Sequence, residues 1–463
     1  MITLSYDSGT LLATVPHGSP PPPEPFVWDA RTAQWRAPGG AYRDVVLGLK
    51  ASGIPYTDRA CRFEKLHLES RVAMEPRPYQ REALTAWRRG TPELRGVVVL
   101  PTGAGKTAVA VSVMEKLGRS TLVVVPTLAL LKQWYSILQD SFGHAVTVGL
   151  LGGGYHEVTP LTVTTYDSAY IHAERYGDRF GLVVYDEVHH LPAEKYAVVP
   201  KMLLAPYSLG LTATPERPDG GHERLPELVG PVVYRRSPED LAGTYLAPFE
   251  TVRIPIQLTA PERVDYEVAD AVYRDFLQKH RLSVRSPEDW QRFIMVASTS
   301  HSGGREALLA ARRRRELRAN AERKGATLER LLKEHWSDRT IVFTKSVDEV
   351  YALSGRFLIP GITFETPARE RKEILDRFRE GRYRAIVASD VLNEGVDVPE
   401  ANVAVILAGS ASRREYVQRL GRVLRPREGK KAILYELVTE GTGEEAVARR
   451  RTESYATNAG GAP

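Results

Sequence analysis

The sequence predicts an α/β protein with two parallel-sheet lobes, a small α+β N-terminal module and a helical insertion. Three observations support this fold class. Short apolar runs alternate with helical stretches over residues 76–243 and again over 325–440. Residues 261–324 instead have helical periodicity throughout. The chain of 463 residues is also too long for a single core, so we expect several domains.

The N-terminal module is predicted over residues 1–75. Apolar residues alternate on both sides of a polar turn, Asp7–Thr10, which predicts a β-hairpin. The alternating residues are Ile2, Leu4, Tyr6, Leu11, Ala13 and Val15. A short amphipathic helix is predicted further on, where apolar residues recur with helical spacing at Tyr42, Val45, Val46 and Leu49.

The two lobes are predicted from their apolar runs. In the first lobe, 76–243, the strand candidates are residues 97–100, 121–125, 161–164, 182–185 and 208–211. The second lobe combines 244–260 with 325–440, and its strand candidates are 340–343, 385–388, 403–407 and 432–437. The polar tail, 441–463, is expected to fray.

A glycine-containing loop follows the first apolar run of the first lobe and precedes a predicted helix. Its sequence is Pro101-Thr102-Gly103-Ala104-Gly105-Lys106-Thr107. Backbone N–H groups of such a loop bind phosphate oxygens, helped by the N-terminus of the helix. Lys106 would neutralise the β- and γ-phosphates of a nucleotide, and Thr107 would bind Mg²⁺. The complete pattern has glycine where this chain has Leu100.

Two acidic residues, Asp186 and Glu187, end another apolar run of the first lobe. The carboxyl ends of parallel strands line the crevice where ligands bind. We therefore expect Asp186 to hold Mg²⁺ and Glu187 to orient and deprotonate an attacking water. The alternative, a solvated acidic turn, is disfavoured by the Lys106 loop. His189 is expected to relay the nucleotide state rather than bind metal, because no third ligand has suitable spacing.

Two further segments complete the candidate nucleotide site. Arg422 and Arg425, in the phrase that begins at Gln418, share one face of a predicted helix and are candidate arginine fingers. An arginine-rich solvated face is the alternative. About 26 residues before Lys106, Arg77 and Gln80 belong to a phrase whose glutamine amide can recognise an adenine edge.

The order of these motifs resembles that of superfamily 2 helicases, and within them the XPB-type DNA repair helicases. The superfamily motifs are Arg77–Gln80, Pro101–Thr107, Val125–Thr127, Asp186–His189, Thr212–Thr214, Ile341–Thr344, Gly395–Asp397 and Gln418–Arg425. The XPB-type features are Leu191-Pro192-Ala193 after the Asp-Glu-Val-His box, Ser412-Arg413-Arg414 before Gln418, the short N-terminal module and the helical insertion.

The resemblance implies two RecA-like lobes with ATP and Mg²⁺ between them, DNA across both lobes, and a thumb-like insertion that clasps DNA. The N-terminal module resembles the damage-recognition domain of that family. Thr212 and Thr214 resemble the motif that couples hydrolysis to strand movement, and Gly395 and Asp397 belong to a nucleotide-binding motif. A nuclease or a transcription or repair protein is an expected partner.

One departure from the family concerns strand separation. XPB-type helicases carry an Arg-Glu-Asp triplet after Thr-Ala-Thr, whereas this chain has Glu216-Arg217-Pro218-Asp219. The residue types are present, so Arg217 is a candidate DNA contact, but their order differs and a proline intervenes. Efficient unwinding is therefore less expected than DNA-driven ATP hydrolysis.

The charge distribution points to the insertion as a DNA contact. The net charge is +6, and residues 301–330 hold nine Lys/Arg against four Glu. Phosphate contacts are expected from Arg312, Arg313, Arg314 and Arg315. A solvated face paired to Glu316 and Glu322 is the alternative. Trp290 and Phe293 are either base-stacking residues or, more commonly for such aromatics, core residues.

The amino-acid composition excludes several classes of protein and of metal site. Cys61 is the only cysteine, which excludes an intramolecular disulfide, a cysteine-ligated iron–sulfur cluster and a zinc ribbon. No apolar run approaches the roughly 20 residues of a membrane span, and the N-terminus lacks signal-peptide features. We expect a cytoplasmic protein, nucleoid-associated if bacterial, without a membrane partner.

The leading prediction is an ATP-dependent DNA helicase or translocase that acts on duplex or forked DNA. An RNA helicase or a duplex translocase that never separates strands is the second reading, because no motif distinguishes these cleanly. The third is a damage-binding scaffold whose ATPase is a conformational switch, which would bind lesions tightly even without Lys106.

Overall fold

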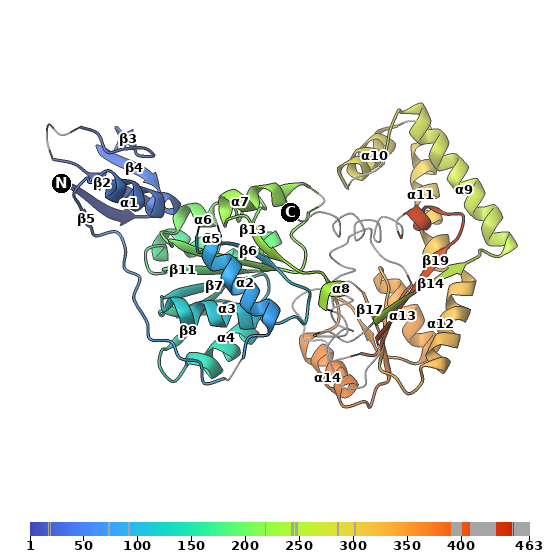
Figure 1. Cartoon of the computed structure of the whole chain (residues 1–463). Coiled ribbons are helices and arrows are strands. Elements are labelled where there is room, and N and C mark those ends of the chain that lie inside the picture. The colour runs from blue at the N-terminus through green and yellow to red at the C-terminus, as the bar shows by residue number, and fades with distance from the viewer. Residues whose placement is uncertain are drawn as a thin grey trace. The chain divides into compact units, whose positions relative to one another are not determined.

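The structure is a computed structural model, and it divides into two compact units, Met1–Ser237 and Pro238–Pro463 (Figure 1). It describes all residues except 17, 19, 73–74, 91–92, 218, 242–244, 246–248, 285–286, 301, 390–400, 408–431, 447 and 449–463. Within the part of the chain so described, no helix is long and apolar enough to cross a membrane.

The N-terminal module is a five-stranded sheet, in the order β3-β4-β2-β1-β5, with one helix packed on it. The predicted hairpin and helix are both confirmed. Leu4, Leu11 and Leu49 are fully buried in the module's core. The elements are β1 (Ile2–Asp7), β2 (Thr10–Thr14), β3 (Val27–Asp29), β4 (Gln34–Pro38), η1 (Gly39–Ala41), α1 (Tyr42–Ala51) and β5 (Tyr56–Asp58).

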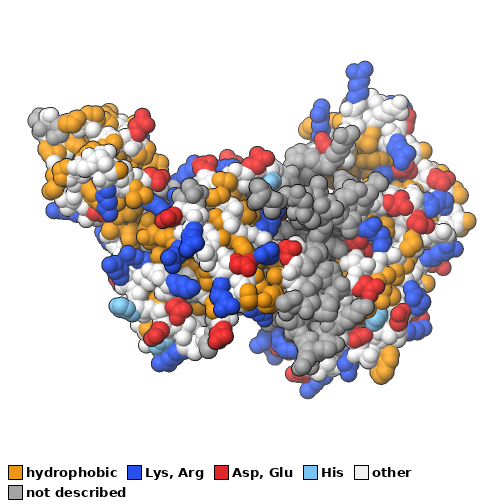
Figure 2. Space-filling view, viewed as in Figure 1, with side chains coloured by type: hydrophobic (Ala, Val, Ile, Leu, Met, Phe, Trp, Pro, Cys, Tyr) orange, Lys and Arg blue, Asp and Glu red, His pale blue; other side chains and the backbone are white. Residues whose placement is uncertain are grey.

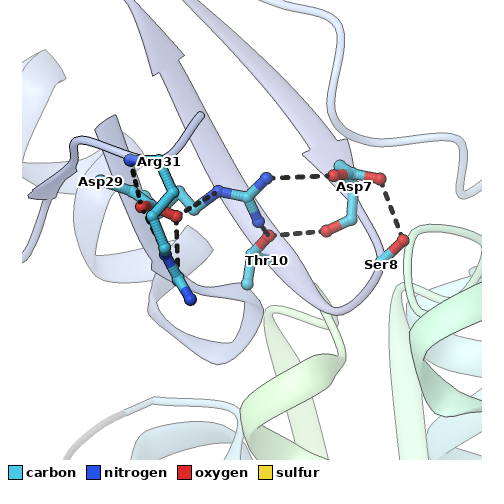
Figure 3. Close-up of polar contacts among 6 residues, drawn as sticks. Asp7, Ser8, Thr10, Asp29 and Arg31 are labelled. Atoms are coloured by element: carbon cyan, nitrogen blue, oxygen red, sulfur yellow. Dashed lines mark hydrogen bonds and ion pairs between the residues drawn. The ribbon is translucent and has the colours of Figure 1, made fainter. Parts of the chain in front are cut away.

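A polar network orients the edge hairpin β3–β4 (Figure 3). Asp29 of β3 accepts from the Arg31 guanidinium at 3.0 and 3.2 Å. Arg36 of β4 donates to Thr10 Oγ1 at 3.1 Å and to Asp7 Oδ2 at 3.3 Å, and forms an ion pair with Asp29. Such exposed ion pairs contribute at most about 1 kcal/mol each, so the network fixes the hairpin's position more than its stability.

The segment after β5 runs along the first lobe. Arg62 N donates to Asp178 O at 2.8 Å, and Leu66 N donates to Gly118 O at 2.9 Å. Tyr6 of the module reaches the same lobe, where its hydroxyl donates to Met202 O at 2.9 Å. The module is therefore anchored to the first lobe by backbone hydrogen bonds.

The first lobe contains an eight-stranded sheet in the order β13-β6-β12-β11-β7-β10-β8-β9. All neighbouring strands are parallel except β8 and β9. The strands are β6 (Arg95–Val99), β7 (Thr121–Val125), β8 (Val148–Gly152), β9 (Tyr155–His156), β10 (Leu161–Thr165), β11 (Leu182–Asp186), β12 (Tyr207–Thr212) and β13 (Val232–Arg235). All five predicted strands are confirmed, whereas β8, β9 and β13 were not predicted.

Helices connect these strands, as expected for a parallel sheet (Figure 1). They are α2 (Pro78–Arg89), α3 (Lys106–Leu117), α4 (Leu128–Phe142), α5 (Tyr166–Tyr176), η2 (Val188–His190), α6 (Val199–Met202), η3 (Gly221–Arg224) and α7 (Leu225–Leu228). The central strand β11 is entirely buried, which explains its continuous apolar sequence.

The second unit contains a six-stranded, fully parallel sheet in the order β14-β19-β18-β15-β17-β16. Its strands are β14 (Phe249–Ile256), β15 (Thr340–Phe343), β16 (Gly361–Ile362), β17 (Ala385–Ala388), β18 (Val403–Ile406) and β19 (Ala432–Thr439). The associated helices are α8 (Pro238–Leu241), α12 (Glu322–Glu334), α13 (Val347–Phe357) and α14 (Ala368–Arg379). The four predicted strands are confirmed, while β14 and β16 were not predicted.

Three helices form the insertion: α9 (Ala260–Lys279), α10 (Pro287–Thr299) and α11 (Gly304–Ala319). They share a separate core that includes Tyr273, Phe276 and Phe293. Phe293 is fully buried there, with its ring against both other rings. The base-stacking role considered for Phe293 is therefore wrong, because the ring is needed to close this small core.

Candidate active site

The predicted phosphate-binding loop lies between the end of β6 and the start of α3. Gly103 and Gly105 have φ of 83° and 76°, which glycine adopts without a Cβ penalty. Leu100 does not have positive φ, and its N–H donates to Thr212 O at 3.0 Å, so glycine is not required there. Lys106 Nζ donates to Leu100 O at 3.3 Å, at the mouth of the loop.

The loop fits phosphate and Mg²⁺ by its donor set. The Thr102 hydroxyl oxygen is buried and has no hydrogen-bond partner among the described residues. Thr107 lies in the first turn of α3, where the positive end of the helix dipole favours an anion. The Thr107 hydroxyl and the Asp186 carboxylate are oxygen ligands of the kind that Mg²⁺ prefers.

Asp186 is held at the carboxyl end of β11 by two donors. Trp134 Nε1 donates to Oδ2 at 2.8 Å, and Glu187 N donates to Oδ1 at 3.0 Å. Burial, followed by the neighbouring Glu187 carboxylate, raises the pKa of Asp186 to about 6, while Trp134 and Lys106 favour the ionised form. The carboxylate is therefore ionised at pH 7 and above.

Glu187 occupies an unusual backbone position directly after the strand. Its φ is 46°, a left-handed conformation that is uncommon outside glycine and that concentrates at functional sites. The turn brings Glu187 Oε2 to 3.4 Å from Thr212 Oγ1 and to 3.5 Å from His189 Nδ1. The candidate catalytic carboxylate is thus in contact with both predicted coupling residues.

The Thr212 hydroxyl is the centre of this coupling cluster, which consists of Glu187, His189, Thr212 and Thr214. His189 Nδ1 lies 3.0 Å from Thr212 Oγ1, and both side chains are fully buried. Thr214 N donates to the same oxygen at 3.1 Å. A shift of Thr212 would therefore change the environment of Glu187.

Arg217 is partly buried and bonds to one buried backbone segment and one exposed carboxylate. Its Nη1 donates to His189 O at 2.7 Å, and Nε and Nη2 bond to Asp219 at 2.8 and 2.5 Å. The side chain is 19% exposed. All three guanidinium nitrogens have partners within the lobe, so Arg217 has a structural role there, and its contact with DNA stays a prediction.

Gln80 is also engaged by the protein. Its Oε1 accepts from Arg77 N at 2.8 Å and its Nε2 donates to Ala104 O at 2.9 Å, while Tyr79 also donates to Ala104 O. The amide thus caps α2 and supports the phosphate loop. This arrangement differs from the expected adenine contact, because both polar ends of the amide already have protein partners.

Five predicted site residues lie outside the described residues: Gly395, Asp397, Gln418, Arg422 and Arg425. Their roles in binding nucleotide and stabilising the transition state remain predictions.

The arginines of α11 differ strongly in their surroundings. Arg314 is 17% exposed, forms an ion pair with Asp270 at 2.5 Å and covers the Tyr273 ring at 4.2 Å. Arg312 and Arg313 are exposed and paired to Glu316 and Asp265. Arg314 is therefore a packing residue of the insertion and not a free phosphate ligand.

Arg315 is exposed, with its guanidinium 5.9 Å from the centre of the partly buried Trp290 ring. Over the face seen in Figure 2, basic and acidic side chains are interspersed on the second unit. DNA contact by the exposed arginines of α11 stays a prediction.

Two site residues were not predicted from sequence. Trp134 donates to Asp186, and Tyr166 OH donates to Asp186 O at 3.0 Å. Trp134 shares the apolar face of α4 with Leu131 and Leu138, so its pattern indicates only a core residue. A polar bond made across 52 residues leaves no local signal.

Three protein-family models match the chain. The damage recognition domain of the xeroderma pigmentosum group B helicase matches residues 4–60. The res subunit of type III restriction enzymes matches 73–217, and the helicase conserved C-terminal domain matches 323–427.

Relatives match over most of the chain. The DNA 3'-5' translocase XPB2 of Sulfurisphaera tokodaii is 41% identical over 430 residues, covering 90% of this chain and 96% of that protein. The DNA 3'-5' helicase XPB of Kineococcus radiotolerans is 34% identical over 388 residues, covering 81% of this chain and 62% of that protein. The Pyrococcus furiosus Hef helicase domain has a TM-score of 0.57 at 19% identity, covering 82% of this chain and 99% of that structure, which shows a shared fold.

Proposed function

This chain belongs to the XPB family of superfamily 2 helicases, and we propose that it moves along DNA in the 3'-to-5' direction, driven by ATP hydrolysis. Relatives that are 41% and 34% identical are named for 3'-5' translocase and helicase activity. The enzyme is an ATP-dependent DNA helicase. Its direction of movement and the roles of its residues are the parts that we propose.

The observation that carries the ATP-driven part of this proposal is the convergence of four functional groups at one sheet edge, while the direction rests on the names of the relatives. Strands β6, β12 and β11 are neighbours, and their carboxyl ends lead into the phosphate loop, Thr212 and Asp186. Asp186 and Glu187 are consecutive, and Glu187 contacts Thr212. This edge is where nucleotides bind in open parallel sheets.

Each of these residues would perform a separate part of ATP hydrolysis. ATP would supply the phosphoryl group, and Mg²⁺ would neutralise charge that develops on its oxygens. The loop N–H groups and Lys106 would bind the phosphates, while Thr107 and Asp186 would hold the metal. Glu187 would orient the attacking water and accept its proton, and Thr212 would link that carboxylate to the rest of the motor.

Translocation on duplex DNA without efficient strand separation is the second form of this function. The interior contacts of Arg217 with His189 and Asp219 favour it, because this arginine is not free to contact a DNA strand. In this form, hydrolysis drives movement while separation of the strands is slow.

Strand-displacement assays with two DNA substrates test the proposal. One substrate is a blunt DNA duplex carrying a third, triplex-forming strand, and the other is a forked duplex with a 3' single-stranded arm. We expect ATP-dependent displacement of the third strand, with fork unwinding slower. Lys106→Ala protein is the matched control for passive displacement.

The direction is tested with forks that carry only a 3' or only a 5' arm. Preference for the 3' arm is expected, whereas preference for the 5' arm would overturn the proposed polarity. Failure to displace either strand in the presence of ATP would overturn the motor function.

A further inference from the structure

A groove on the second lobe lies at the amino edge of its sheet. It has a volume of about 630 Å³ and is bounded by the ends of α12 and α13. Thr340 and Ala385, the first residues of β15 and β17, line its floor. Because nucleotide sites form at the carboxyl edge of parallel sheets, the groove lies at the edge that the motor chemistry does not use.

Two large apolar side chains are exposed at this groove. Trp336 is 75% exposed and Leu358 is 89% exposed, and the half-buried Phe357 and Tyr383 lie beside them. Leu358 also ends α13 with φ of 54°, a position at which glycine is favoured. A large apolar side chain is thus held exposed at a backbone position that favours glycine, at the rim of the groove.

The groove also has an excess of positive charge. Lys333, Arg356, Arg382 and Arg384 line it together with only two carboxylates, Glu329 and Asp338. Glu329 is paired to Lys333, Asp338 to His335, and Arg382 to Glu380 outside the groove.

Two of these cations remain available. Within the described ranges, neither Arg356 nor Arg384 has a carboxylate within ion-pair distance. Arg384 donates to Ser337 O, and the Arg356 guanidinium lies 5.1 Å from the centre of the Phe357 ring, with Glu329 near enough to interact electrostatically. Arginine binds carboxylates through two parallel hydrogen bonds, which makes these two side chains suited to an acidic ligand.

We propose that this groove binds an acidic peptide segment of a partner protein. An apolar or aromatic side chain of the peptide lies between Trp336 and Leu358, and flanking carboxylates bind Arg356 and Arg384. The combination of exposed apolar anchors with arginines that have no carboxylate within ion-pair distance favours a peptide over DNA, whose backbone offers charge without an apolar side chain. A second copy of the same face would bring like charges together.

Binding of a designed peptide tests the proposal. The probe is a fluorescein-labelled peptide of twelve residues, mostly Asp and Glu, with one Phe and one Leu at its centre. Fluorescence anisotropy is measured with the full chain. We expect saturable binding that weakens with salt. Replacing Phe and Leu by Ser, or the carboxylates by amides, is expected to weaken binding at least about tenfold.

Variants of the protein locate the site. Leu358→Gly removes the anchor at a position where glycine suits the backbone, so we expect about tenfold weaker binding without a lower melting temperature. Arg356→Gln with Arg384→Gln is expected to weaken binding similarly. Phe364→Ala is the matched control, because Phe364 is 69% exposed on the same lobe but outside the groove.

Several results would overturn the proposal. Wild-type affinity in Leu358→Gly, equal binding of the amide peptide, or no saturable binding below about 1 mM would each do so. Full displacement of the peptide by duplex DNA would make the groove a nucleic-acid site instead. DNA-stimulated ATP hydrolysis is expected to be unchanged in the groove variants, so failure of this test is distinguishable from failure of the motor function.

Discussion

Two regions carry residues that the sequence identifies as candidate site residues: the carboxyl edge of the first-lobe sheet, and helix α11 of the insertion. The surroundings of those residues differ between the two regions. At the sheet edge, Asp186, Glu187 and Thr212 come from two neighbouring strands and meet. On α11, the charge of Arg312 and Arg314 is matched by Glu316 and Asp270. Motif residues at strand ends are brought together by topology, whereas a run of charge is readily neutralised by its own neighbours.

The largest expected effect tests the sheet edge. Lys106→Ala should lower ATP turnover by about a thousandfold, because it removes the charge that stabilises the transferred phosphoryl group. Among the residues that the structure describes, Lys106 has one hydrogen bond, to Leu100 O, so the fold should persist. Steady-state hydrolysis is compared with that of Lys132→Ala, an exposed lysine on α4. Comparable turnover in the two variants would refute the site.

The next prediction concerns which arginines of α11 contribute to the stability of the insertion. Arg314→Ala should lower the free energy of unfolding by about 2 kcal/mol, because it leaves Asp270 without this ion pair and uncovers Tyr273. Arg312→Ala should change it by less than about 0.5 kcal/mol, as for other exposed i,i+4 pairs. Urea denaturation measures both. Equal losses of stability would show that the packing role of Arg314 is overstated.

The pH dependence of turnover tests Asp186. Burial raises its pKa to about 6, so the metal-binding carboxylate is lost as pH falls through that value. At low Mg²⁺ we expect turnover to drop about tenfold from pH 8 to pH 5, and added Mg²⁺ to move the midpoint lower by competing with the proton.

Protonation of Asp186 has opposite effects on turnover and on the free energy of unfolding: it lowers turnover but favours the folded state. Because the folded-state pKa lies above the ordinary 3.8, the folded chain binds the proton more tightly, and protonation of Asp186 favours folding. Circular dichroism at pH 5 checks that a loss of turnover does not come from unfolding. A turnover midpoint that does not respond to Mg²⁺ would assign the titration to another group.

A smaller effect separates positioning from DNA contact. Arg217→Ala should reduce DNA-stimulated turnover about fivefold, because His189 loses its support, while DNA affinity and its salt dependence stay the same. Fluorescence anisotropy with labelled duplex at several salt concentrations measures both quantities. A flatter salt dependence in the variant would restore Arg217 as a phosphate contact.

Sequence predicts the parts of this molecule that depend on local pattern. Strands β6, β7 and β11 can be predicted because continuous runs of Val and Leu mark strands buried on both faces, while in β10 and β12 the apolar residues are interspersed with Thr, Ser or Gly. Strand β8 was missed because glycines at Gly149 and Gly152 dilute its apolar run. Strand β14 has no continuous apolar run and contains Pro255, although its alternation of polar and apolar residues is the kind of signal that predicts β1 and β2.

The candidate site, like the fold, can be predicted from sequence only in the parts that depend on local pattern. Positions that follow a strand, such as Lys106 and Asp186, can be placed from sequence, because the strand end fixes where they lie. Contacts between distant segments cannot: Trp134 on Asp186 and Arg217 on His189 depend on how helices and loops fold back over the sheet. Sequence therefore identifies the chemistry of the edge more readily than the residues that hold it.

The most direct test of the central claim is steady-state ATP hydrolysis measured side by side without nucleic acid and with forked DNA, blunt duplex DNA and single-stranded RNA. We expect strong stimulation by both DNA substrates, weak stimulation by RNA, and none with Lys106→Ala protein. Equal stimulation by RNA, or no response to DNA, would contradict it.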